Sequence, residues 1–82
     1  MQIKILKRAD KFISKQDKPT RIRLIDAITD ISQADEHEKL EKYPLFKWRV
    51  GDYRIIYDQN GTILTIVLVG NRGQVYKDLK RL

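Results

Sequence analysis

Hydrophobic periodicity divides the first half of the chain into one strand and two helices. Residues 2–6 (QIKIL) alternate between apolar and polar positions and predict a short strand. Residues 7–16 place Ala9, Phe12 and Ile13 on one side of a short helix. After the break at residues 17–20, a second helix carries an apolar stripe formed by Ile22, Leu24, Ile25, Ala27, Ile28 and Ile31. Together the two form a helical hairpin, and we expect residues 33–44 to be a loop or a frayed helix end.

The second half alternates with the period of strands. Strands 46–50 and 53–58 meet at Gly51-Asp52, which suits a type II′ turn. A two-residue loop fixes the register, with Arg49 facing Arg54 and Lys47 facing Ile56. Asn60-Gly61 predicts the next turn, with Tyr57 facing Leu64 and Tyr53 facing Leu68.

This register assigns the side chains to two faces of the sheet. Phe46, Trp48, Tyr53 and Tyr57 share the face that we expect the helices to cover. The opposite face carries cations, and also three apolar residues of the third strand that need cover: Ile63, Val67 and Val69. The C-terminal stripe of Val75, Leu79 and Leu82 is the candidate. The fold class is therefore α+β, β-α-α-β-β-β with a C-terminal helix or tail over a small, mainly antiparallel sheet.

Composition narrows the class of protein. Eighty-two residues are enough for one domain, which we take to span residues 1–82. Lys and Arg number 17 against 11 Asp and Glu, so the net charge of +6 favours an anionic partner. The chain has no cysteine, which excludes thiol catalysis and thiolate metal sites. The N-terminus reads as neither a signal peptide nor a membrane span, so we expect a cytoplasmic protein.

Five residues carry the candidate chemistry. Lys47, Arg49 and Arg54 converge on one open face, where like charges directly opposite each other are unfavourable unless an anion lies between them. Arg72, in a glycine-flanked loop, and Tyr76, one helical turn later, can complete the site from the end of the third strand. Each of these residues has a plainer interpretation, as a solvated cation or a packing aromatic. The one histidine, His37, lies in an acidic and exposed-looking stretch, and we give it no role.

Cations alone can promote one reaction of RNA. A ribose 2′-OH attacks its own 3′ phosphodiester, and clustered Arg and Lys stabilise the charge of the phosphorane. Crowded cations also disfavour a protonated lysine, so Lys47 is a candidate general base. Such a reaction needs neither a metal nor an organic cofactor.

The segments "GDYRIIY" (51–57) and "LVGNR" (68–72), followed by Tyr76, resemble the RelE/ParE superfamily of toxins, and the RelE branch in particular. The resemblance implies an endoribonuclease that cleaves mRNA, typically in the ribosomal A site, and is neutralised by an acidic antitoxin. By resemblance Lys47 is the base, Arg54 and Arg72 stabilise the phosphate, Tyr76 orients the substrate and Arg49 supports them. One departure is Leu45, where the RelE branch has a second lysine. The alternatives are a ParE-like inhibitor of DNA gyrase and a non-catalytic RNA-binding domain.

Overall fold

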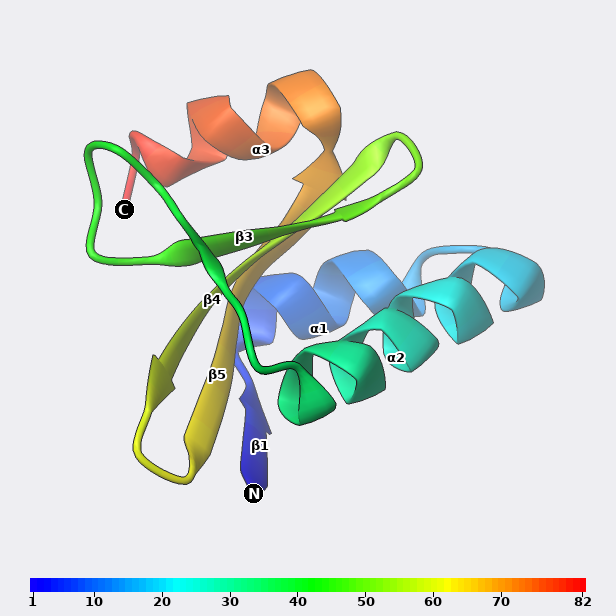
Figure 1. Ribbon diagram of the computed structural model, residues 1–82. Coiled ribbons are helices and arrows are strands. Elements are labelled where there is room, and N and C mark those ends of the chain that lie inside the picture. Colours follow the sequence, from blue (N-terminus) through cyan, green and yellow to red (C-terminus); the bar gives the residue numbers. More distant parts are fainter.

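The computed structural model describes residues 1–82 as a five-stranded sheet with helices on both faces (Figure 1). The order along the chain is β1 (Gln2–Ile5), α1 (Lys7–Ser14), α2 (Lys18–Gln33), β2 (Glu38–Lys39), β3 (Phe46–Val50), β4 (Tyr53–Asn60), β5 (Ile63–Asn71) and α3 (Arg72–Leu79). The strands lie in the order β1-β5-β4-β3-β2, and only the β1–β5 pair is parallel. The predicted α+β class is confirmed, with the addition of strand β2.

Helices α1 and α2 pack on one face of the sheet and bury the larger of two cores. This core contains 11 buried residues, among them Leu24, Ile31, Ile55 and Tyr57, with Trp48 and Tyr53 packed against its edge. The predicted assignment of the β3 and β4 aromatics to the helix face is therefore confirmed. The stripe on α2 was only partly right, because Ile22 and Ile25 are 49% and 44% exposed while Leu24, Ala27, Ile28 and Ile31 are buried.

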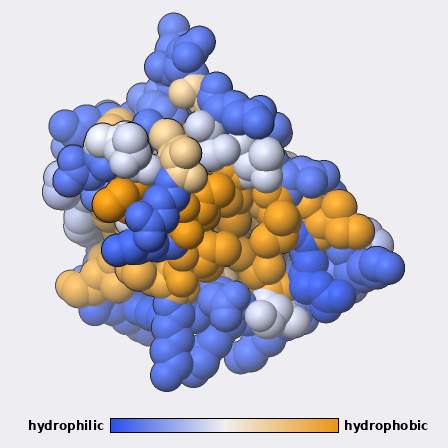
Figure 2. Space-filling view, turned by 90° about the horizontal axis from the view of Figure 1, so that it is seen from below, coloured by the Kyte–Doolittle hydropathy of each residue, from blue (hydrophilic) through white to orange (hydrophobic).

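Exposed apolar side chains also lie at the β1 edge of the sheet. Ile3 and Ile5 pair in register with Leu64 and Ile66 of the helix-side core, yet are 42% and 36% exposed. The helices therefore leave this edge of their own face uncovered. Figure 2, which views the molecule from below, shows a broad apolar area on this side.

Helix α3 covers part of the opposite face. Val75 and Leu79 are buried against Ile56 and Leu68, with Val67 packed beside them. A C-terminal helix therefore covers this face as predicted, but of the three residues expected beneath it only Val67 is there. The prediction that Leu82 belongs to this stripe was wrong, because it lies beyond the helix and is 64% exposed. None of the three helices has the length and apolar composition that crossing a membrane requires.

The β3–β4 register was predicted correctly, and the β4–β5 register was not. Arg49 faces Arg54 and Lys47 faces Ile56, as expected. In the second hairpin, however, Tyr57 faces Ile66 and Asn60 faces Ile63, so the turn residues are Gly61 and Thr62. A type I′ turn needs positive φ at both central residues. Only Gly61 has one (φ 61°), so Asn60 continues the strand instead.

A β-bulge next to Tyr57 changes the register further. Beyond it, Tyr53 faces Asn71 and Ile55 faces Val69. The extra residue on β5 reverses which side chains face the helices. Val69 is consequently buried in the helix-side core, not on the cationic face as predicted, and Leu68 packs under α3 in its place.

Candidate functional site: the cationic face

The cationic face of the sheet is built by the alternation of β3 and β4. Trp48 points to the helices, so its neighbours Lys47 and Arg49 point the other way, next to Arg54 of β4. Gly70 of β5 lies opposite Arg54, and a side chain at Gly70 would meet Val75 of α3 at 3.4 Å. Helix α3 therefore packs close to the sheet beside the cations.

A hollow of about 210 Å³ is lined by Lys47, Arg49, Arg54 and Glu38, and we call it the cationic hollow. Arg54 is held by its own turn, since its Nη1 donates to the carbonyl oxygens of Gly51 and Tyr53 at 2.9 and 2.8 Å. Arg49 is exposed, and no carboxylate pairs with it. The three predicted cations of the sheet are thus brought together, with donors free to receive an anion.

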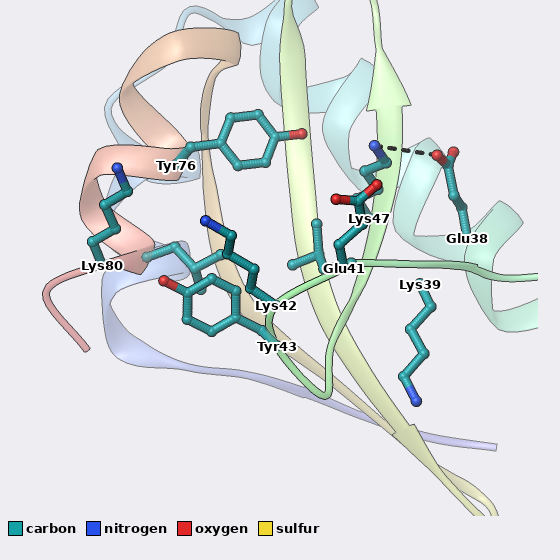
Figure 3. Close-up of a pocket in the computed structure, with 10 residues that line it drawn as sticks. Glu38, Lys39, Glu41, Lys42, Tyr43, Lys47, Tyr76 and Lys80 are labelled. Carbon is teal, nitrogen blue, oxygen red and sulfur yellow. Dashed lines mark ion pairs between the residues drawn. The ribbon is translucent and has the colours of Figure 1, made fainter.

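A second hollow, of about 350 Å³, adjoins the first and contains Tyr76 (Figure 3). Its walls include Tyr43 and Leu40 from the segment before β3, and Tyr76 and Leu79 from α3. Lys47 and Glu38 line both hollows, so the two are continuous around this ion pair. We call this second hollow the tyrosine pocket. A flat ring can lie against its aromatic walls while a bound phosphate meets the cations.

Arg72 lies apart from both hollows. It is the first residue of α3 and is exposed, and its backbone N–H donates to the carbonyl oxygen of Asp52 at 2.8 Å. This bond ties the start of α3 to the β3–β4 turn, beside Arg54. The structure therefore places Arg72 at the end of the cationic face and not inside a hollow.

Two parts of the site were missed by the sequence interpretation, and both lie in residues 33–44. This segment is not simply a loop or a frayed helix end, because β2 pairs with β3 and sets Glu38 opposite Lys47. Glu38 Oε2 lies 3.2 Å from Lys47 Nζ. Tyr43 was missed because a single aromatic in a polar stretch shows no periodicity. The pair Leu40 and Tyr43, three residues apart, was the only signal.

His37 is half-buried and not exposed as expected, and it anchors this segment to the helix-side core. Its Nδ1 lies 2.9 Å from the hydroxyl of Tyr57, and its ring packs against Phe46 and Tyr57. Burial of the Tyr57 side chain, and to a smaller extent the negative charge of Glu38, raise the pKa of Tyr57 to about 12. The Tyr57 hydroxyl therefore stays protonated at neutral pH and shares this hydrogen bond with Nδ1 of His37.

Comparisons with known proteins identify the family and the fold of this chain. A family model, the ParE toxin of the type II toxin–antitoxin system parDE, matches residues 3–76. The chain belongs to this toxin family, within the RelE/ParE superfamily. No curated protein sequence matches it significantly.

Solved RelE structures share the fold of the toxin. The intact RelBE toxin–antitoxin complex of E. coli matches with a TM-score of 0.73 at 21% identity, over 85% of this chain and 94% of that one. The isolated E. coli RelE toxin matches with a TM-score of 0.72 at 17% identity, over 98% and 95%. The archaeal RelE–RelB complex of Pyrococcus horikoshii matches with a TM-score of 0.67 at 25% identity, over 89% and 96%. The predicted superfamily and fold are confirmed.

Proposed function

We propose that this toxin is a metal-independent endoribonuclease that cleaves mRNA during translation. The observation that carries the proposal is the open cationic hollow, in which Lys47, Arg49 and Arg54 converge without being needed for the core. A scissile phosphate in this hollow would receive guanidinium and ammonium donors as its charge increases in the transition state. The site of action would be the cytoplasm, where mRNA is translated.

The neighbouring residues have roles that follow from their positions. Arg54 and Arg49 would hold the phosphate from two strands, and Lys47 would meet it from the border of the two hollows. Tyr76 would stack on a base next to the scissile bond, inside the tyrosine pocket. Arg72, outside both hollows, would reach the RNA backbone from the end of the face. Because the site is small, the ribosome would supply much of the substrate geometry.

Primer extension on an mRNA translated with the purified toxin tests this proposal. We expect new 5′ ends that require the toxin and ribosomes, and that disappear with Arg54→Met. The absence of cuts in translated mRNA would refute the nuclease.

Inhibition of DNA gyrase is the second candidate, favoured by the match to the ParE model over residues 3–76. A binding protein of this kind does not need the residues of the cationic hollow. DNA breaks that depend on gyrase, with intact mRNA, would establish it. If neither mRNA cuts nor DNA breaks occur, a non-catalytic RNA-binding role is left.

A cognate antitoxin is part of the proposal, since the RelBE and RelE–RelB structures that match are toxin–antitoxin complexes. We propose an acidic partner, because its carboxylates would pair with a chain of net charge +6. Its apolar segment would cover exposed apolar residues such as Ile3, Ile5, Ile22 and Ile25. The affinity should fall as salt is added, and an affinity independent of salt would contradict the electrostatic part.

A further inference from the structure

Glu38 is the one acidic side chain among the cations of the cationic hollow. Two features hold it there. Strand β2 sets it opposite Lys47 in the β2–β3 register, and its carboxylate pairs with the Lys47 ammonium at 3.2 Å. Figure 3 shows this pair at the border of the tyrosine pocket, with Lys47 between Glu38 and the Tyr76 side. The Glu38 side chain is 70% exposed, so its carboxylate is open to a ligand.

The proposed reaction needs a base for the 2′-OH, and the site offers few. The Lys47 ammonium already pairs with a carboxylate oxygen at 3.2 Å, and this position suits a proton donor or an electrostatic contact better than a base. His37 lines a neighbouring hollow, but its Nδ1 is already hydrogen-bonded to the hydroxyl of Tyr57 at 2.9 Å. The exposed carboxylate of Glu38 offers acceptor oxygens that can take a proton directly.

We infer that Glu38 is the general base of the cleavage reaction, an assignment that rests on the proposed endoribonuclease activity. The carboxylate takes the proton of the 2′-OH while the 2′-oxygen forms a bond to phosphorus. The bond from phosphorus to the 5′-oxygen then breaks with its electron pair, and the Lys47 ammonium protonates that oxygen. The products are a 2′,3′-cyclic phosphate and a free 5′-OH. Afterwards the protonated Glu38 returns its proton to neutral Lys47, which restores the ion pair.

The opposite role for Glu38 is a block, in which its carboxylate occupies the place of the substrate phosphate. The two roles predict opposite effects of Glu38→Gln. Loss of a base slows the reaction, because a general base contributes about 10²- to 10⁴-fold to the rate. Loss of a blocking anion speeds it, or tightens substrate binding.

Single-turnover cleavage of translated mRNA, with toxin in excess, separates these outcomes. We expect Glu38→Gln to lower the cleavage rate by about 10²-fold or more. The matched control is Asp35→Asn, an exposed carboxylate nearby that lines neither the cationic hollow nor the tyrosine pocket. It should cleave at the wild-type rate. An unchanged or faster rate in Glu38→Gln would overturn the assignment.

The dependence of the same rate on pH, from about pH 6 to 8.5, identifies the base. A carboxylate is already deprotonated across this range, so the wild-type rate should stay level. In Glu38→Gln the residual rate should rise about 10-fold per pH unit, because hydroxide then acts as the base. A wild-type rate that rises with pH in this way indicates a lysine base and overturns the inference. If the wild type makes no cuts at all, the proposed function fails instead, and the two failures are thus distinguishable.

Discussion

The two faces of the sheet use the same strands for different purposes. On the helix side, 11 buried residues form a continuous core under α1 and α2. On the other side, only four buried residues pack together between α3 and the sheet, two of them from α3 itself, and the rest of the face is open and cationic. Neighbours such as Lys47 and Trp48 therefore differ in what a substitution should cost. One face stabilises the fold, and the other leaves its cations open to a ligand.

The largest loss of stability is expected on the helix face. Leu24→Ala removes a fully buried side chain from the main core and should lower the free energy of unfolding by about 2–5 kcal/mol. Chemical denaturation followed by circular dichroism measures this. The control is Ile25→Ala, one residue away and 44% exposed, which should cost much less. Equal losses would show that α2 does not pack as described.

The largest loss of activity is expected on the cationic face. Arg54→Met removes donors from the cationic hollow and should slow mRNA cleavage by about 10²- to 10³-fold. Arg21→Met is the matched control, because Arg21 is an exposed arginine of α2 that also donates to a backbone carbonyl. Both variants should unfold within about 1 kcal/mol of the wild type. If Arg54→Met keeps full activity, the hollow does not hold the scissile phosphate.

Tyr57 anchors the segment before β3 to the helix-side core through His37. Tyr57→Phe leaves Nδ1 of His37 without its hydrogen-bond partner and should destabilise the toxin by about 1 kcal/mol at neutral pH. The pKa of Tyr57 is raised to about 12, so the folded state favours the protonated hydroxyl. The stability that this adds is complete below about pH 10 and is lost as the pH rises toward 12. Unfolding curves at several alkaline pH values should therefore show the wild type losing its advantage over Tyr57→Phe, and a constant difference would contradict this.

The smallest expected effect is the contribution of the Glu38–Lys47 pair to stability. Ion pairs in contact with solvent contribute about 0–1 kcal/mol, so Glu38→Gln should unfold almost as the wild type does. Its thermal midpoint is the measurement. A large drop would mean that Glu38 holds β2 in place, and the loss of activity in this variant would then have a structural cause.

How well each strand and turn could be predicted depends on whether its sequence has a turn motif or a regular alternation of apolar and polar residues. The β3–β4 hairpin was predictable because Gly51 marks the turn and β3 alternates strictly, and this placed Lys47, Arg49 and Arg54 together. The β4–β5 register was not predictable, because Asn60-Gly61 suggests a turn at these two residues while the chain turns at Gly61 and Thr62. The β-bulge could not be predicted either, because it does not change the hydrophobic pattern of a strand that is apolar on both faces. Strand β2 is two residues long, which is too short for any period. The position of Glu38 beside Lys47 could therefore not be predicted from the sequence, because it depends on the pairing of β2 with β3.

The chemistry of the RNA ends tests the central claim most directly. When translated mRNA is cut by the purified toxin, the upstream fragments should end in a 2′,3′-cyclic phosphate and the downstream fragments should begin with a 5′-OH. This result would show that the 2′-oxygen attacks the scissile phosphate, as the cationic face implies. Intact mRNA together with gyrase-dependent DNA breaks, or fragments that begin with a 5′-phosphate, would contradict the account.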